Sequence, residues 1–280
     1  MFDAILWKTN GVLQRGARFL TFKVMITAKT KLNAVIGFPL AHSLSPAFHN
    51  EEYVRRGHDA VLMAFEHEDL SALIQVLRTL KIGLTAVTLP FKETILPLLD
   101  ELDPLAERLG SVNTVLNIRG KLKGFNTDYV GIQTALKDVP LTGKKVLLLG
   151  AGGVAKPVAA FVNDSGAELL CMNRSRERAE ELVKLFGGRV LEEIDLEGKS
   201  FDIVINATPV GLAPNVDGTP LDAHYLQPEH VVFDIVYNPE ETRLLREAKA
   251  AGAQTRSGLL MFKAQALEQI QLWETLVLNS

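Results

Sequence analysis

Cysteine is almost absent from this chain, and so are long apolar segments and a strong net charge. Cys171 is the only cysteine among 280 residues, which excludes an internal disulfide and a cysteine-rich metal site. No apolar run approaches the roughly 20 residues of a membrane-spanning helix. A formal net charge of -3 gives no electrostatic reason to expect nucleic acid as the main partner. We therefore expect a cytoplasmic protein with no nucleic-acid partner and no membrane partner.

The clearest local pattern in the chain is the stretch from Lys144 to Asn173. The apolar residues 146–149 predict a strand that is buried on both faces. The glycine turn GAGGVA follows at once, and the small residues after it predict a helix over 155–163. A second apolar run at 169–172 predicts the next strand. Strand, glycine turn, helix and strand in this order are typical of the first half of a dinucleotide-binding unit.

Each residue of the glycine turn has a physical reason to be small. Gly150 permits the tight turn, and Gly152 lets a pyrophosphate approach the backbone. Ala155 lets the helix lie close to the strand, while Gly153 and Val154 lead into the helix start. The free N–H groups there face an anion in the field of the helix dipole. We therefore expect this turn to bind the cofactor.

The tip of the second strand predicts which dinucleotide binds. NAD sites usually place Asp or Glu about 20 residues after the turn, on the ribose 2′-hydroxyl. This chain has Asn173, Arg174 and Ser175 there, with Arg178 one turn further on. A guanidinium suits a 2′-phosphate, and each charge-assisted hydrogen bond contributes about 1.5–3 kcal/mol. The sequence therefore predicts NADP, with the neighbouring Arg176 assigned to solvating the helix start.

Residues 1–31 differ from the rest of the chain. They contain six lysines and arginines but one acidic residue, Asp3, and no clear signal-peptide core. We expect a dispensable extension; a disordered tail, a weak targeting segment and initiation at Met25 are the open alternatives. Deleting residues 1–24 is expected to leave folding intact.

The rest of the chain alternates between strand and helix patterns, which indicates an α/β protein throughout. The predicted strands are 32–37, 60–65, 83–89, 112–118, 121–125, 201–207 and 231–236. The predicted helices are 45–56, 70–80, 104–110, 126–138, 176–186, 240–251 and 258–278, with a further one opened by Pro90. Ser45 is the expected N-cap of its helix, with Pro46 at the first helical position.

Ten short segments then occur in an order that identifies a family. They are GFP (37–39), HSLSP with HN (42–50), VTLPFK (87–92), GSVNT (110–114), NTD (126–128), GAGGVA (150–155), NRS (173–175), NATPVG (206–211), DIVYNP (234–239) and GLLM (258–261), with Gln265 after them. From Leu32 to about Leu276 the chain resembles the shikimate dehydrogenase family. So many motifs in one order make coincidence negligible.

The resemblance implies a fold and an activity. The fold is α/β with two domains, an N-terminal substrate domain over 32–128 and a Rossmann-type NADP-binding domain over 129–257, with a cleft between them. Residues 258–280 are expected to return to the substrate domain. The implied reaction is the reversible, NADP-dependent reduction of 3-dehydroshikimate to shikimate in aromatic amino acid biosynthesis. A quinate/shikimate dehydrogenase and a non-catalytic cleft-binding paralogue are the alternatives.

The resemblance also implies roles for single residues. Lys92 and Asp128 are the catalytic pair, although local sequence alone would assign Asp128 to a helix cap and Lys92 to the solvated surface. Which of the two is the formal base stays open. The substrate residues it implies are Ser43, Ser45, Thr88, Lys92, Asn113, Asp128, Tyr237 and Gln265. On the cofactor side it adds Thr208, Ile235, Gly258 and Met261 to the residues of the glycine turn and the strand tip.

Three further expectations concern the residue at position 86, the two histidines near the start of the substrate domain, and the oligomeric state. Ala86 stands where the family usually has Asn, and the loss of one neutral hydrogen bond costs about 0.5–1.5 kcal/mol. Substrate identity depends on this position, because Thr85 would point to the opposite face of the strand. His42 and His49 have no carboxylate at ligand spacing, so we expect no metal. The oligomeric state is expected to be monomer or homodimer.

Overall fold

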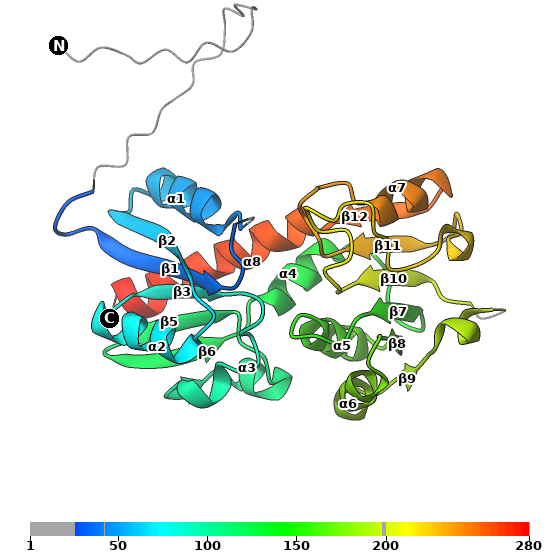
Figure 1. Cartoon of the computed structure of the whole chain (residues 1–280), viewed down its shortest axis with the longest axis horizontal. Helices are drawn as coiled ribbons and strands as arrows, with labels where there is room; N and C mark the ends of the chain where they lie inside the picture. The colour runs from blue at the N-terminus through cyan, green and yellow to red at the C-terminus, as the bar shows by residue number, and fades with distance from the viewer. Residues whose placement is uncertain (1–25, 42, 198–199, 280) are drawn as a thin grey trace, which may run out of the picture.

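The computed structural model describes residues 26–41, 43–197 and 200–279, which form two six-stranded sheets (Figure 1). Most of the expected N-terminal extension lies outside these residues. Among the described residues, no helix is long and apolar enough to cross a membrane.

The first sheet is mixed, with strand order β2-β1-β3-β5-β6-β4. Its strands are β1 (Lys31–Gly37), β2 (Ala60–Glu66), β3 (Leu84–Val87), β4 (Glu101–Leu102), β5 (Thr114–Ile118) and β6 (Lys121–Phe125). Its accompanying helices are α1 (Ser45–Arg56), α2 (Leu70–Thr79) and α3 (Pro104–Leu109), with a 3-10 turn η1 (Leu96–Leu98). β1, β2 and β3 run parallel, while β5 is antiparallel to both β3 and β6.

Alternate residues of each strand of the first sheet pack into two separate cores. Ala34 and Ile36 of β1 face a cluster with α2, whereas Val35 faces α1 and the C-terminal helix. Both clusters consist of fully buried apolar side chains. This is why the three consecutive residues Ala34, Val35 and Ile36 of β1 are all apolar instead of alternating with polar ones.

The second sheet is all parallel, with strand order β12-β11-β10-β7-β8-β9. Its strands are β7 (Lys145–Leu149), β8 (Glu168–Met172), β9 (Arg189–Val190), β10 (Ile203–Asn206), β11 (Val231–Asp234) and β12 (Gln254–Ser257). Its helices are α5 (Ala155–Asp164), α6 (Arg176–Phe186) and α7 (Arg243–Ala250), with 3-10 turns η2 (Glu193–Leu196) and η3 (Ala223–Tyr225). This is the strand order of a Rossmann fold. Successive strands are added on one side of β7 up to β9 and then on its other side from β10 onward, so the order of the strands reverses between β7 and β10.

Two helices connect the sheets. α4 (Asp128–Ala135) leaves the first sheet for the second, and α8 (Gly258–Trp273) returns from β12 to pack on α1 and β3 (Figure 1). α8 ends in a π-helical turn, Glu274–Leu278. The helices cross where Gly131 of α4 meets α8: a Cβ on Gly131 would lie 2.8 Å from the carbonyl oxygen of Met261. A residue without a side chain is therefore needed at the crossing.

Most predicted elements are confirmed to within a few residues, and Cys171 is buried in β8 as expected. Burial raises the pKa of its thiol to about 12. The strands β4, β9 and β12 were not predicted, because two of them have only two residues and β12 has the polar sequence QTRS.

Two local predictions were wrong. Pro90 does not open an α-helix: residues 89–95 form turns that lead into η1, so Lys92 lies in a turn. Ser45 is not the N-cap of α1, because Leu44 takes that position and no side chain caps the helix. Pro46 still lies in the first turn, as expected. Neither error changes which residues face the site.

Candidate active site

Lys92 and Asp128 form a nearly buried ion pair. Lys92 Nζ lies 2.6 Å from Asp128 Oδ2, and the two side chains are only 12% and 5% exposed. Asp128 is the first residue of α4, and its backbone N–H donates to Oδ1 of Asn126. The carbonyl of Lys92 accepts from the N–H of Val112 (2.7 Å), which ties the turn after β3 to the start of β5. The structure thus brings together two residues that are far apart in sequence.

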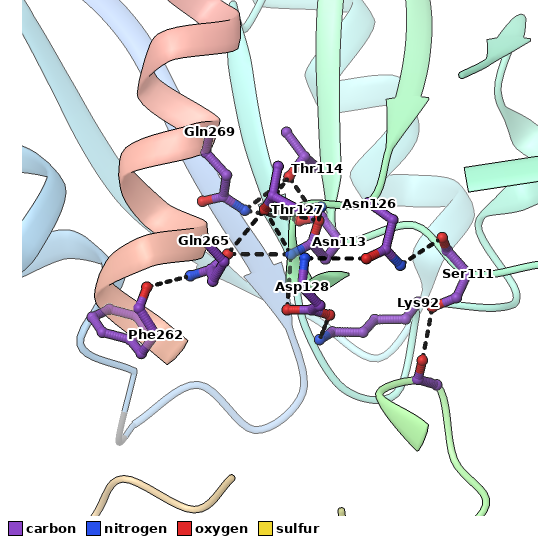
Figure 2. Close-up of polar contacts among 11 residues, drawn as sticks. Lys92, Ser111, Asn113, Thr114, Asn126, Thr127, Asp128, Phe262, Gln265 and Gln269 are labelled. Carbon is purple, nitrogen blue, oxygen red and sulfur yellow. Dashed lines mark hydrogen bonds and ion pairs between the residues drawn. The ribbon is translucent and has the colours of Figure 1, made fainter. Parts of the chain in front are cut away.

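Asn113 is the centre of the polar network around this pair (Figure 2). Its Nδ2 donates to Asp128 Oδ1 at 2.9 Å, Thr127 Oγ1 at 3.0 Å and Gln265 Oε1 at 3.2 Å. Its Oδ1 accepts from the N–H of Thr127 and the hydroxyl of Thr114. An amide nitrogen has two hydrogens for these three acceptors, so at least one contact is shared. A substrate hydroxyl can replace the weakest of them at little cost.

Gln265 reaches this network from α8. Its amide nitrogen donates to the carbonyl of Phe262 at 3.0 Å, which directs Oε1 toward Asn113 and Thr127 (Figure 2). A Cβ on Gly131 would lie 3.2 Å from the Cβ of Gln265, so the close crossing of α4 and α8 sets this position.

Ser43 and Ser45 lie where the chain enters α1. Ser43 Oγ accepts from the N–H of Ser45 at 3.3 Å, and Ser45 is buried in the first turn. Tyr237, from the loop after β11, has its phenol pKa raised, mainly by burial and also by the negative charge of Asp128; the backbone of Leu44 acts in the opposite direction. Tyr237 therefore lies between the serine segment and the ion pair.

Thr88 is half-buried at the end of β3, and its N–H donates to the carbonyl of Ile36. Within the described part of the chain its hydroxyl makes no hydrogen bond, which leaves it available to a ligand. The expected substrate residues thus come from six places: the start of α1, the end of β3 with the turn after it, the start of β5, the start of α4, the loop after β11, and α8.

The expected cofactor residues lie at one edge of the second sheet. The glycine turn follows β7, Asn173 to Ser175 follow β8, Thr208 follows β10, Ile235 follows β11 and Gly258 follows β12. Since all these strands are parallel, their carboxyl ends meet at the same edge. The order reverses between β7 and β10, and ligands of open α/β sheets bind at such a reversal.

The glycine turn has the geometry that a dinucleotide needs. Gly150 has φ +108, and a Cβ there would lie 2.9 Å from Thr208 Cγ2, so the neighbouring loop packs directly on it. A Cβ on Gly152 would have nothing within 4 Å. Open space next to backbone N–H groups at the start of α5 is where a pyrophosphate would lie. Val154 is the N-cap residue of that helix.

The arginines after β8 differ in their partners. Arg176 forms ion pairs with Glu180 and Glu192, which confirms that it belongs to the solvated helix surface. Arg174 and Arg178 are exposed and form no ion pair with any described residue. Asn173 Nδ2 donates to the carbonyl of Ser175, which fixes the turn that carries Arg174. Arg174 is therefore free to meet a phosphate at this edge.

Known proteins match both halves of the chain. One family model, the shikimate dehydrogenase substrate binding domain, covers residues 35–115, and a second, shikimate / quinate 5-dehydrogenase, covers 133–216. A shikimate dehydrogenase (NADP(+)) of Bacillus cereus is 40% identical over 261 residues, or 89% of this chain and 94% of that relative. The chain belongs to the shikimate dehydrogenase family.

Solved structures agree with this membership in the shikimate dehydrogenase family. Shikimate dehydrogenase from Aquifex aeolicus has a TM-score of 0.85 at 38% identity, over 90% of this chain and 95% of that one. The Thermus thermophilus enzyme in complex with NADP(H) and shikimate has a TM-score of 0.81 at 39% identity, over 88% and 94%. A quinate dehydrogenase from Corynebacterium glutamicum in complex with NAD has a TM-score of 0.80 at 31% identity, over 88% and 94%. The predicted fold class and family are confirmed.

Ala86 is the departure from the pattern of the shikimate dehydrogenase family. It is buried on β3, in the cluster that contains Val35, Leu40 and Phe125. Val87, the next residue, lies in the cluster on the other face, which confirms that Thr85 cannot replace Ala86. Met261 is also a core residue, buried in the cluster between α8 and α4.

Sequence reasoning missed the role of Asp234, at the end of β11. Its carboxylate accepts from Asn206 Nδ2 (2.9 Å), the N–H of Val236 (3.0 Å) and the hydroxyl of Thr242 (2.6 Å). Burial raises the pKa of this carboxyl to about 6, although all three donors lower it. Asp234 thus joins the loop after β10, the segment before Tyr237 and the start of α7. Its position at a strand end inside a recognised motif was the available signal.

His49, one of the two histidines weighed as metal ligands, has hydrogen-bond partners inside the fold. His49 is fully buried between the carbonyl of Ser45 (2.9 Å) and Gln269 Oε1 (3.1 Å), and desolvation lowers its pKa to about 4. His42 lies outside the described residues. Within those residues, no three His, Cys, Asp or Glu side chains group so as to hold a metal ion.

Proposed function

We propose that this chain reduces 3-dehydroshikimate to shikimate reversibly, with Lys92 and Asp128 as its proton-transfer pair. The observation that carries the assignment of the pair is the buried 2.6 Å contact between Lys92 and Asp128, held by Asn113. The activity shared by its relatives, shikimate dehydrogenase with NADP(+), confirms the reaction and the cofactor expected from the sequence.

The residues present fit NADP. Open space beside Gly152 accepts a pyrophosphate, and Arg174, without an ionic partner among the described residues, suits the 2′-phosphate. Thr208, Ile235 and Gly258 would lie along the rest of the cofactor at the same sheet edge. Bound NADPH supplies the hydride that reduces the ketone, and NADP accepts it in the reverse direction.

The chain itself must move the proton and hold the ring. The Lys92 ammonium has three hydrogens. One of them forms the hydrogen bond to Asp128, and the others can reach the substrate oxygen. Asp128 holds the ammonium in place, and its second oxygen is fixed by Asn113. We propose that the pair exchanges the proton with the substrate oxygen as one unit, because a direct 2.6 Å contact joins the two groups.

The other proposed substrate contacts follow from where the remaining polar residues lie in the fold. Ser43 and Ser45, at the start of α1, suit a carboxylate in the field of the helix dipole. Thr88, Asn113 and Gln265 offer groups that pair with ring hydroxyls, and Tyr237 lies between the two sets. This division would give the substrate one orientation, with its reacting carbon beside the Lys92 ammonium.

The nearest alternative is a quinate/shikimate dehydrogenase, and Ala86 is the observation that favours it. An apolar methyl stands where the family's amide would bond the substrate, so recognition of the ring is weakened there. Arg174 argues against strict use of NAD, and so against some quinate dehydrogenases.

Turnover with shikimate or quinate, each with NADP or NAD, tests these alternatives through the nicotinamide absorbance. Turnover restricted to shikimate with NADP would support the proposal. Turnover of quinate would indicate that Ala86 changes how the ring of the substrate is recognised. Tight NADP binding without turnover in any combination would favour a non-catalytic paralogue and contradict the proposal.

Three coarser proposals accompany this one. We propose that residues 32–128 with 258–280 act as the substrate domain and 129–257 as the cofactor domain, with a cleft between them. The packing of α8 on α1 and β3 supports this division. We also propose a cytoplasmic enzyme that is a monomer or a homodimer, which gel filtration with light scattering would test.

A further inference from the structure

The glycine turn is in direct contact with the segment that carries the catalytic lysine. A Cβ on Gly153 would lie 3.0 Å from the Cβ of Lys92 and 3.7 Å from Glu93 Oε1. The carbonyl of Gly153 accepts a buried hydrogen bond from the hydroxyl of Ser111 at 2.9 Å. The turn that is expected to face the cofactor therefore packs directly on the side-chain stem of Lys92.

Lys156, in the first turn of α5, completes this contact. Its Nζ lies 2.9 Å from Glu93 Oε2 and 3.0 Å from the carbonyl of Gly110. Glu93 directly follows Lys92, and Gly110 is the left-handed C-cap of α3, with φ +56. The Lys156 side chain is 18% exposed and that of Glu93 is 42%. We call Lys156, Glu93, Gly110, Ser111 and Gly153 the Lys156 cluster.

The other end of α5 is attached to the same part of the molecule. Asp164, the last residue of α5, pairs with Arg108 of α3 at 2.6 Å and accepts from the hydroxyl of Tyr129 at 2.7 Å. α5 is thus fixed near both of its ends to elements outside the second sheet.

The segment around Lys92 is a turn with no regular helix, so no continuous ladder of helical hydrogen bonds holds it. Its backbone is held by separate bonds, among them those from Phe91 to Thr88, from Ile95 to Phe91 and from Val112 to Lys92. A lysine side chain has four rotatable carbons, and its ammonium follows any shift of the backbone. A misplacement of about 1 Å in a catalytic group can cost up to roughly 100-fold in rate.

We propose that Lys156 is a positioning residue that holds Lys92 at a fixed place relative to the glycine turn, and so relative to the cofactor. The inference rests on the proposed function of the Lys92–Asp128 pair. Lys156 acts through Glu93 and Gly110 and does not touch the substrate. Because its partner Glu93 is partly exposed, the ion pair itself contributes little to folding. Its effect is expected on turnover and not on stability.

The experiment compares Lys156→Met with Lys156→Arg and with the control Lys144→Met. Lys144 also forms a lysine–carboxylate ion pair, with Asp202 at 2.7 Å, but at the amino end of β7, away from the cofactor edge. The readouts are kcat, the Kd of NADPH, the melting temperature, and the primary deuterium isotope effect with 4-deuterated NADPH. Wild-type protein that is inactive would contradict the proposed function; every other outcome addresses Lys156.

For Lys156→Met we expect kcat to fall roughly tenfold or more, with a larger isotope effect and with the Kd and melting temperature close to wild type. Lys156→Arg should recover most of the loss, and Lys144→Met should match wild type. A raised Kd with unchanged kcat would make Lys156 a phosphate ligand and overturn the proposal. Unchanged kinetics, or losses in kcat and stability together, would overturn it as well.

A double-mutant comparison tests the route through Glu93. If Lys156 acts through Glu93, then Lys156→Met combined with Glu93→Ala should be no slower than Lys156→Met alone. Two losses that simply add would mean that the residues act independently, which would overturn this route.

Discussion

Single residues with several roles define the site, and Asn113 is the clearest example. Its amide contacts Asp128, Thr127 and Gln265, so one side chain joins β5, α4 and α8. The Lys92–Asp128 pair beside it is nearly buried. In such surroundings removing one partner of an ion pair leaves the other uncompensated, which costs more than the pair contributes.

Lys92→Ala is expected to reduce kcat by roughly 100-fold or more while changing the affinity for NADPH less than threefold. In the proposed mechanism the ammonium exchanges the proton, whereas the proposed cofactor site lies at the edge of the other sheet. Steady-state kinetics with shikimate and a direct NADPH titration measure the two effects. Equal losses in both would show a structural role for Lys92.

Arg174→Ser is expected to raise KM for NADP roughly tenfold or more, with little change for NAD, because one charge-assisted hydrogen bond to the 2′-phosphate is lost. The control is Arg176→Ser, since Arg176 already pairs with Glu180 and Glu192. A smaller effect at Arg174 than at Arg176 would contradict the assignment.

Ala86→Asn is expected to lower KM for shikimate by up to about tenfold if the new amide reaches the ring. The position is buried among apolar side chains, so an amide without a partner would instead lower the melting temperature. Measuring both quantities for shikimate and quinate separates ring recognition from packing. An unchanged KM for both substrates would mean that position 86 has no part in recognition.

Secondary-structure elements set the distances between these residues. α4 begins with Asp128 and α8 carries Gln265, and the two helices cross at Gly131. The crossing therefore couples the position of one site residue to that of another. The start of α8 is equally close-packed, because a Cβ on Gly258 would lie 2.1 Å from the carbonyl oxygen of Ile235.

Gly131→Val is expected to destabilise the protein by about 1–3 kcal/mol and to raise KM for shikimate, because a side chain there forces α8 away from α4. Chemical denaturation and steady-state kinetics measure the two effects. Gln133→Val, on the exposed face of the same helix, controls for the helix propensity of valine. If both variants behaved alike, the close crossing would not matter.

For the whole molecule, two buried titratable groups oppose one another in their effect on stability. The pKa of Asp234 is raised from 3.8 to about 6, so its contribution to the free energy of unfolding falls as pH rises through that range. The pKa of His49 is lowered from 6.5 to about 4, so its contribution rises with pH over an overlapping range. The two slopes largely cancel.

Single substitutions should therefore reveal each slope. Between pH 4 and 6, the free energy of unfolding of Asp234→Asn should rise with pH more steeply than that of wild type, by up to about 1.4 kcal/mol per pH unit. His49→Gln should show the opposite change. Urea unfolding at several pH values measures both, and parallel curves for all three proteins would show that neither pKa differs between the folded and unfolded states.

Much of this architecture could be predicted from local sequence because its causes are local. The apolar run before Gly150 and the small residues after it define strand, turn and helix without any distant contact. A role for Arg174 at the 2′-phosphate could also be predicted, since that prediction depends only on the position of the residue at a strand tip. The turn around Lys92 was wrongly predicted as a helix, because Pro90 favours both structures and distant contacts decided between them.

The alternation of strands and helices, the dinucleotide turn and, through ordered motifs, the family could thus be inferred without any coordinates. Which polar residues meet depends instead on the packing of distant segments. Lys92 and Asp128, Asn113 and Gln265, and Lys156 and Glu93 are separated by tens of residues or more, and parallel strands and crossing helices bring them together. Local propensity is a property of neighbouring residues, whereas these contacts depend on how two sheets and two connecting helices pack.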